Sequence, residues 1–213
     1  TPSSSSAASD VYKRQMEHDA CGVGLVASTE GVKSRKVVEY GIQALKAVWH
    51  RGAIDADGKT GDGAGIHIEI PKDFFIEKIE ITGHRHDDSD LCVGMIFLPR
   101  NDYQGQEQCR IMVESELTTK NFNIYGWRQV PVNPSVLGEK AENTRPEITQ
   151  VLFKHNDKKV IGKNLERVLY ETRRKIEKEA LNNQLNGFYI CSFSSRSIIY
   201  KGMFLAEALS DFY

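Results

Sequence analysis

The sequence predicts an α+β fold in which strands pair in antiparallel fashion. Short apolar runs bounded by glycine or proline, such as 66–70 and 91–98, have the length and composition of strands. They alternate with helical patterns, the strongest of which repeats apolar residues every three or four positions over 165–176. The last two runs, 188–193 and 197–201, are close enough to form a hairpin, which argues against a purely parallel sheet.

The composition is that of a globular chain without a nucleic-acid or membrane partner. Its 213 residues can form one domain with a sizeable core or part of a larger one. The formal net charge is −1, and no basic excess favours nucleic acid or an anionic membrane. No apolar run approaches the roughly 20 residues that span a bilayer.

The beginning of the chain differs from the rest. Residues 1–15 are rich in serine and alanine and have no periodicity, so we expect them to be disordered or foreign to the native protein. They contain no apolar segment of the kind found in a secretory signal. Met16 is a candidate start, which makes residues 16–20 a short pro-segment.

The first helix is expected to begin after Ser34, a residue type that commonly caps helices. Its apolar face is formed by Val38, Ile42, Leu45 and Trp49. The helix should end near residues 50–52, and a loop rich in glycine and aspartate then leads to the alternating strand 66–70, which Pro71 closes.

The remaining elements follow from the same patterns. We expect a helix over 72–79, a charged loop over 82–90, a strand over 91–98, a helix over 101–120, a strand over 122–130, a loop with one or two helical turns over 131–145, a strand over 148–153, the long helix around 165–176, the hairpin over 188–201 and a helix starting within 204–212. Glu171 precedes Lys175 by four residues and should pair with it, while Arg173–Lys175 should lie on the solvated face. The chain ends inside a helical pattern and reads as cut short.

Cys21 is the candidate nucleophile. It begins an apolar run, and Gly22 and Gly24 leave room beside it for a substrate or another backbone. A thiol needs a base, and an N-terminal cysteine obtains one from its own α-amine, which requires removal of the residues before it. The competing interpretation is a buried structural cysteine in a strand over 21–27.

Other clusters have simpler explanations than chemistry. Cys92, Cys109 and Cys191 are scattered without a Cys-x-x-Cys pair, so we expect reduced, packed thiols and no disulfide or zinc site. The glycines of 61–65 open a strand where a phosphate loop opens a helix, so turning and close backbone approach account for them better. The histidines and aspartates of 82–90 have no second cluster at ligand spacing, which favours a solvated loop over a metal site.

Several motifs together resemble one family. They are Glu-His-Asp-Ala-Cys-Gly-Val-Gly (17–24), His-Arg-Gly-Ala (50–53), Gly-Asp-Gly-Ala-Gly-Ile (61–66), Gly-Trp-Arg-Gln-Val-Pro-Val (126–132), Leu-Gly-Glu-Lys-Ala (137–141), Phe-Tyr-Ile-Cys-Ser-Phe-Ser-Ser-Arg (188–196) and Tyr-Lys-Gly-Met (200–203). With these motifs, the chain from Met16 to Tyr213 resembles the N-terminal class II glutamine amidotransferase domain of glutamate synthase large subunits.

The resemblance implies a fold and a site. The fold is a four-layer αββα N-terminal-nucleophile hydrolase sandwich, incomplete here at the C-terminus, with 1–20 as leader and pro-segment and 21–213 as the first part of the domain. Cleavage before Cys21 makes it the nucleophile that attacks the amide of glutamine, with Arg51 lining the substrate pocket. The family's Arg-Phe-Ser and His-Asn-Gly-Glu motifs, which bind the carboxylate and form the oxyanion hole, are expected beyond Tyr213, so the segment alone should be inactive. Asn186-Gly187 is expected to be a connector between helix and strand, not the oxyanion hole.

The resemblance also implies cofactors and partners. This segment is expected to hold no metal or cofactor, while the complete enzyme uses FMN and an iron–sulfur cluster in downstream synthase domains that make glutamate from 2-oxoglutarate. A small electron-donating subunit or ferredoxin supplies electrons, and the compartment is the cytoplasm or the plastid stroma. Two alternatives stay open: another class II amidotransferase, and an unprocessed, non-catalytic module of the same fold.

Overall fold

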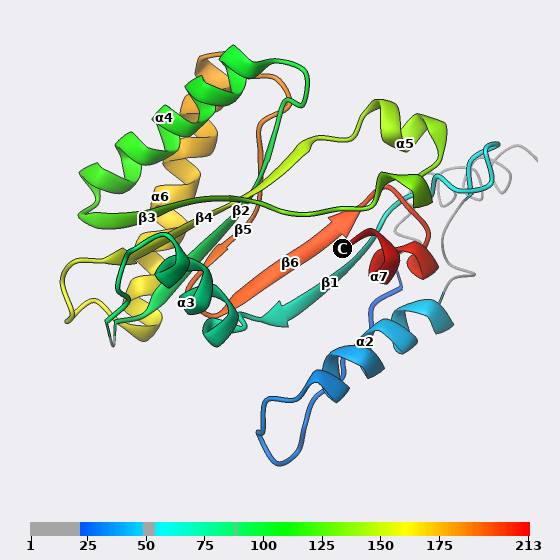
Figure 1. Ribbon diagram of the computed structural model, residues 1–213, viewed down its shortest axis with the longest axis horizontal. Helices are drawn as coiled ribbons and strands as arrows, with labels where there is room; N and C mark the ends of the chain where they lie inside the picture. The colour runs from blue at the N-terminus through cyan, green and yellow to red at the C-terminus, as the bar shows by residue number, and fades with distance from the viewer. Residues whose placement is uncertain (1–21, 49–53, 88) are drawn as a thin grey trace, which may run out of the picture.

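The computed structural model describes residues 22–48, 54–87 and 89–213, which fold into two antiparallel sheets with helices around them (Figure 1). The strands are β1 (Ala64–Glu69), β2 (Leu91–Leu98), β3 (Phe122–Gln129), β4 (Glu147–His155), β5 (Tyr189–Ser194) and β6 (Ser197–Gly202). The helices are α2 (Arg35–Ala47), α3 (Lys72–Ile81), α4 (Tyr103–Thr119), α5 (Glu139–Asn143), α6 (Gly162–Asn182) and α7 (Leu209–Phe212), with 3₁₀ turns η2 (Pro134–Val136) and η3 (Ala206–Ala208).

The sheets lie between helices. One sheet has the order β3-β4-β2-β5 and the other, among the described residues, pairs β1 with β6. From top to bottom, Figure 1 shows α4 and α6, the four-stranded sheet, the β1–β6 sheet and α2. The α+β class and the antiparallel pairing are therefore confirmed.

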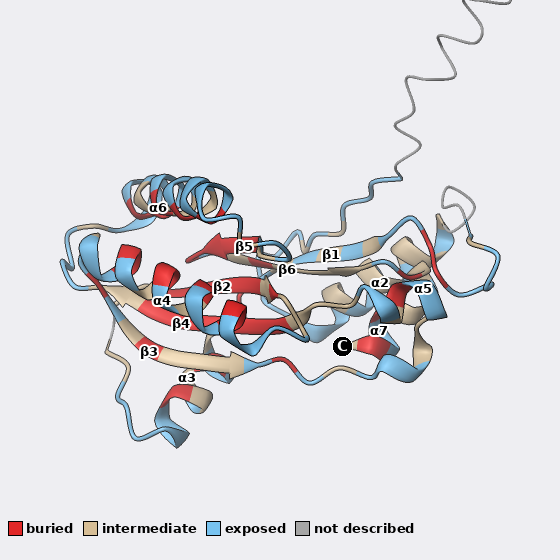
Figure 2. Ribbon diagram, turned by 90° about the horizontal axis from the view of Figure 1, so that it is seen from above, coloured by how far each residue is buried: buried red, intermediate tan, exposed pale blue. Residues whose placement is uncertain are grey.

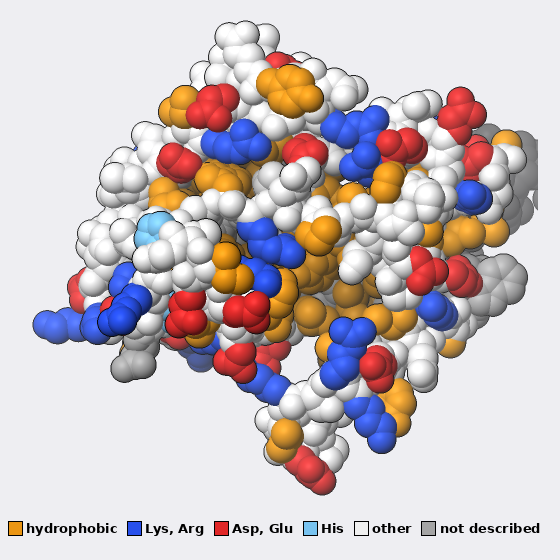
Figure 3. Space-filling view, viewed as in Figure 1, with side chains coloured by type: hydrophobic (Ala, Val, Ile, Leu, Met, Phe, Trp, Pro, Cys, Tyr) orange, Lys and Arg blue, Asp and Glu red, His pale blue; other side chains and the backbone are white. Residues whose placement is uncertain are grey.

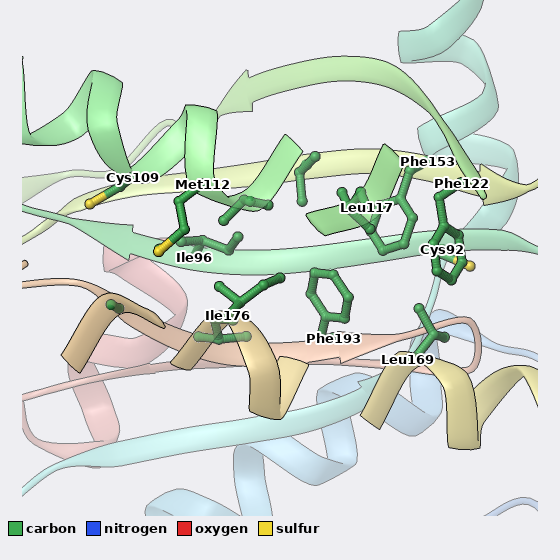
Figure 4. Close-up of a cluster of buried hydrophobic side chains, with 14 of the residues drawn as sticks. Cys92, Ile96, Cys109, Met112, Leu117, Phe122, Phe153, Leu169, Ile176 and Phe193 are labelled. Atoms are coloured by element: carbon green, nitrogen blue, oxygen red, sulfur yellow. The ribbon is translucent and has the colours of Figure 1, made fainter. Parts of the chain in front are cut away.

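One face of the four-stranded sheet packs against α4 and α6. Ile96 and Phe153 of the sheet meet Met112 of α4 and Ile176 of α6 in a buried cluster (Figure 4). The predicted apolar stripe of α6 is confirmed, and its Thr172 is buried with the stripe. Colouring by burial shows that the inward sides of both helices are the buried ones (Figure 2).

The opposite face of that sheet packs against β1, β6 and α3. Val93 and Met95 point into this second core, whereas Cys92 and Ile96 point into the first. Because both faces of β2 are covered, its apolar run is unbroken and does not alternate with polar residues. Part of the second core is open, since Figure 3 shows apolar side chains at the floor of a hollow over β6 and β1.

Helix α2 begins where the sequence predicted and ends slightly earlier. The Ser34 side chain accepts a hydrogen bond from the Lys36 N–H at 3.2 Å, as a capping residue does. Val38, Ile42 and Leu45 are half-buried on the side that faces β1. The helix ends at Ala47, where the Val48 N–H bonds back to the Leu45 carbonyl at 3.2 Å.

The predicted hairpin over 188–201 is wrong. Strand β5 pairs with β2 and β6 pairs with β1, so the chain passes from one sheet to the other at the turn. The carboxylate of Glu166 on α6 holds this crossing: it accepts hydrogen bonds from the Ser194 hydroxyl (2.9 Å) and from the backbone N–H (2.8 Å) and hydroxyl (2.7 Å) of Ser195. Alternating apolar residues predict a strand but do not specify its partner.

The predicted strand over 21–27 is also absent from its described part. Residues 22–28 form no regular element, and the side chains of Val23 and Leu25 are each 91% exposed. A strand needs a partner for its backbone hydrogen bonds, and no described strand pairs with this segment. Cys21 itself lies outside the described residues.

Charged side chains of α6 form contacts with α4 and β5 that the sequence analysis did not predict. Glu171 pairs with Arg167 at 3.0 Å, not with Lys175. Lys175 instead reaches the buried carboxylate of Glu116 on α4 at 2.5 Å. Arg173 donates to the Ile190 carbonyl of β5 at 3.0 Å, so this part of the helix is not simply a solvated face.

Candidate functional site

The two predicted site residues, Cys21 and Arg51, lie outside the described residues. The structure does describe the segments that follow them: residues 22–48 after Cys21 and the loop 54–63 after Arg51. That loop leads directly into β1.

The loop is closed at its base by backbone hydrogen bonds. Ile54 and Gly61 form an isolated antiparallel bridge. Inside it, the Asp55 N–H donates to the Thr60 carbonyl and the Gly58 N–H donates to the Asp55 carbonyl, both at 2.9 Å. The segment from Ile54 to Gly61 is therefore a compact turn with its own internal bonding.

A carboxylate organises the tip of this loop. Asp57 accepts hydrogen bonds from the N–H groups of Lys59 (3.0 Å) and Thr60 (2.7 Å) and from the Thr60 hydroxyl (2.5 Å). These bonds, that of the Thr60 hydroxyl first, lower the pKa of Asp57 to about 2. Asp57 is therefore charged at neutral pH, and Thr60, only 2% exposed, is fixed beside it.

Helix α5 packs against the same loop. Lys140 donates to the Asp55 carboxylate at 2.6 Å, and the Ala141 N–H donates to the Thr60 hydroxyl at 3.4 Å. Sequence reasoning singled out the motif 137–141 but gave it no role. A contact between residues 85 positions apart leaves no local pattern in the sequence.

The glycine motif that follows the loop is structural, as predicted. Gly63 has φ +122°, and β1 begins at Ala64, so the glycines lead into a strand. A Cβ on Gly65 would lie 2.9 Å from the Tyr200 carbonyl oxygen of β6, closer than real side chains come. The motif therefore serves a turn and the close pairing of β1 with β6, which leaves no reason to propose nucleotide binding.

A cavity of about 680 Å³ opens between the loop, α5 and the ends of β2 and β6. Its walls include Phe97, Leu137 and Phe204, and Arg100 and Arg145 lie at its edge. Both arginines donate to Glu142, at 2.5 and 2.7 Å, and lower the pKa of that carboxyl, Arg145 foremost. Because Glu142 shares these guanidinium groups, neither is an uncommitted cation for a substrate carboxylate.

The charged loop 82–90 makes structural contacts. Asp87 pairs with Lys154 at 2.9 Å and Lys158 at 3.4 Å, and His86 Nδ1 lies 3.0 Å from the Tyr125 hydroxyl. Asp88 is outside the described residues. Within the described ranges, no three His, Cys, Asp or Glu side chains are arranged to hold a metal ion, and no helix is long and apolar enough to cross a membrane.

The other three cysteines are separate, buried thiols. Burial raises the pKa of Cys109 and of Cys191 to about 11 and that of Cys92 well above its usual range. Such thiols are protonated at neutral pH and are poor nucleophiles. Cys92 and Cys109 belong to the core between the four-stranded sheet and its helices, and Cys191 belongs to the second core.

Comparison with known proteins identifies the family. The family of class-II glutamine amidotransferases matches residues 21–213. The chain belongs to this family. The matched region includes every residue that the structure describes.

Relatives within that family are much longer proteins. The chain is 56% identical over 204 residues to the glutamate synthase [NADPH] large chain of Azospirillum brasilense, covering 96% of this chain and 13% of the relative. It is 39% identical over 198 residues to ferredoxin-dependent glutamate synthase 2 of Synechocystis (92% and 12%). It is also 39% identical over 199 residues to ferredoxin-dependent glutamate synthase 1, chloroplastic/mitochondrial, of Arabidopsis thaliana (92% and 12%).

Proposed function

We propose that this chain is the beginning of the glutaminase domain of a glutamate synthase large chain. The observation that carries the proposal is the amidotransferase match over 21–213 together with 56% identity to such a large chain. In this proposal, residues 1–20 are a leader and pro-segment, Cys21 is the nucleophile and Arg51 lines the glutamine pocket. The residues for the carboxylate and the oxyanion belong to a later part of the domain.

The chemistry starts with removal of residues 1–20, which frees the α-amine of Cys21. This amine takes the thiol proton, and the thiolate attacks the side-chain amide carbon of glutamine. The C–N bond breaks, the amine-borne proton goes to the leaving nitrogen, and ammonia departs from a γ-glutamyl thioester. Water then cleaves the thioester, which yields glutamate and regenerates the thiol.

The released ammonia is used elsewhere in the same protein. We propose that downstream synthase domains, with FMN and an iron–sulfur cluster, combine it with 2-oxoglutarate to make glutamate. Electrons come from a small partner subunit or from ferredoxin, and the compartment is the cytoplasm or a plastid. The names of the relatives include both an NADPH-dependent and ferredoxin-dependent enzymes, so both donor classes fit the proposal.

The test is the variant Cys21→Ala in the full-length protein. Glutamine-dependent glutamate synthesis should be lost, while synthesis from added ammonia should remain, because only the source of nitrogen is removed. Cys109→Ala, which changes a buried thiol elsewhere, should keep both activities. Glutamine-dependent synthesis that survives Cys21→Ala contradicts the proposal. If Cys21→Ala instead abolishes glutamine-dependent transfer of nitrogen to an acceptor other than 2-oxoglutarate, the protein is another class II amidotransferase. If the Ala20–Cys21 bond is intact in the mature protein, the chain is a non-catalytic module.

A further inference from the structure

We propose that Arg128 on β3 binds a carboxylate of the polypeptide that follows Tyr213, where this later segment covers the apolar hollow over β6 and β1. The inference rests on the proposed function in one respect. The chain covers 13% of the length of the glutamate synthase large chain from Azospirillum brasilense, so the proposed function places further polypeptide beyond Tyr213.

Arg128 is held in place by two neighbouring side chains. Its Nη1 donates a hydrogen bond to Gln150 Oε1 at 2.8 Å, and its guanidinium carbon lies 5.2 Å from the centre of the Phe74 ring. Gln150 is fully buried, and its amide nitrogen donates to the Tyr200 hydroxyl at 3.3 Å, which fixes its orientation. The guanidinium is therefore oriented in the absence of a ligand, which lowers the entropic cost of binding one.

This guanidinium has no anionic partner among the residues that the structure describes. A guanidinium carries several N–H donors in a fixed plane, and that of Arg128 is hydrogen-bonded through Nη1 to a neutral amide. Arg100, Arg145 and Arg173, by contrast, each pair with a glutamate. Arg128 is half-buried, and a charge withdrawn from water without a counterion costs free energy. A carboxylate, with two acceptor oxygens in one plane, is the group that fits the free donors best.

The apolar surface in this proposal belongs to β1 and β6. Their register places Ile66 opposite Tyr200 and Ile68 opposite Ile198, so these side chains share one face. Ile198 is buried, whereas Ile66, Ile68 and Tyr200 are only half-buried. Apolar side chains form the floor of the hollow in Figure 3. Covering such a surface is favourable, because it removes apolar area from water.

Tyr213 connects the later segment to this surface. Its ring lies 5.1 Å from the ring of Tyr200, and its hydroxyl donates to the Lys201 carbonyl at 2.8 Å. Figure 1 marks this end of the chain beside β6. Tyr200 is also the side chain that accepts from Gln150, which in turn holds Arg128. The polypeptide that follows Tyr213 therefore starts next to the open apolar face and close to the guanidinium.

The test locates the partner by photo-crosslinking in the full-length protein. Phe74→p-benzoylphenylalanine puts a photoreactive ring beside the Arg128 guanidinium and leaves the arginine in place. Irradiation should join position 74 to a peptide beyond residue 213 that contains Asp or Glu, as mapped by mass spectrometry. The matched control is Tyr170→p-benzoylphenylalanine, an exposed aromatic position on α6, which covers the opposite face of the sheet. It should not give this crosslink.

Hydrogen exchange separates docking from a merely structural role of Arg128. Exchange of the β1 and β6 amides should quicken by about tenfold or more in Arg128→Met, since hydrogen bonds to charged groups have effects of this size. Neutralising the carboxylate of the crosslinked peptide, Asp to Asn or Glu to Gln, should quicken exchange equally and add nothing in the Arg128→Met background. If Arg128 only holds Gln150, the carboxylate variant has no effect. Arg85→Met, at an exposed loop position, is the control and should leave exchange unchanged.

The inference is overturned by crosslinks confined to residues 1–213, by crosslinks between two copies, or by the absence of any crosslink. It is equally overturned if no carboxylate variant of the crosslinked peptide reproduces the effect of Arg128→Met. A raised KM for glutamine in Arg128→Met, without a crosslink beyond residue 213, would assign the guanidinium to the substrate instead. Should Arg128→Met fail to fold, the crosslink and the carboxylate variants decide. A failure of the proposed function itself is recognised separately, by glutamine-dependent synthesis in Cys21→Ala.

Discussion

At the scale of single residues, burial makes the three described thiols poorly reactive. Cys191 on β5 is buried, and its Sγ lies 3.5 Å from the Ile199 carbonyl. Cys92 and Cys109 are buried in the core between the sheet and its helices. With a pKa near 11, a thiol at pH 8 is about one part in a thousand thiolate, which leaves little to react with an electrophile.

We therefore expect iodoacetamide at pH 8 to leave Cys92, Cys109 and Cys191 unmodified in the native protein. Because the raised pKa means that the thiolate forms only at higher pH, labelling of Cys109 and Cys191 should increase as the pH approaches 11. Mass spectrometry of peptides gives the extent at each site. Guanidinium-unfolded protein, in which all four cysteines should react, is the control. Rapid labelling of any of the three in native protein at pH 8 is the contrary result.

At the scale of elements, the connector from α6 to β5 depends on one glycine. Gly187 has φ +83° and lies between Asn182, the last residue of α6, and Tyr189, the first of β5. The predicted role of Asn186-Gly187 as a connector is confirmed by this placement. A Cβ at Gly187 would lie 3.3 Å from Pro99 Cβ, so an added side chain is disfavoured both by the backbone and by its neighbour.

Gly187→Ala should destabilise the domain without affecting catalysis. A left-handed conformation costs a non-glycine residue about 1–2 kcal/mol, which for a domain of this size lowers the Tm by roughly 2–8 °C. Calorimetry of the full-length variant measures the shift, and glutamine-dependent synthesis at 25 °C should match the wild type. A loss of about a thousandfold in activity with an unchanged Tm would mean that this pair does supply an oxyanion donor.

The elements were predictable to different degrees, for physical reasons. Residues 91–98 and 72–79 were found because their apolar patterns and bounding prolines are local signals, and β2 matches its predicted limits. The partner strands of β5 and β6 were not predicted, because two adjacent strands with the same apolar pattern can form a hairpin or join different sheets. In the structure the Glu166 carboxylate binds the turn between the two strands, from a position 28 residues before Ser194.

The site was predictable only where motifs mark it. Cys21 and Arg51 came from short sequence motifs, and they remain predictions because the structure does not describe them. The network joining Asp55, Asp57 and Lys140 could not be derived, since it depends on the tertiary placement of α5. The motif 137–141 acquires a physical role only once the fold brings it to the loop.

At the scale of the whole molecule, this chain is a small part of a long protein. It spans 12–13% of the length of the relatives that it matches. The complete reaction is therefore proposed only for the whole protein. The described residues place the loop 54–63 and α5 around one cavity, at the same end of the two sheets.

The central claim is that Cys21, freed at its amine, is the nucleophile. It is tested most directly by treating the mature full-length protein with an electrophilic glutamine analogue and mapping the adduct by mass spectrometry. The account predicts one adduct, on a peptide that begins with Cys21. An adduct on Cys92, Cys109 or Cys191 with Cys21 unmodified, or a modified Cys21 still joined to Ala20, would contradict it.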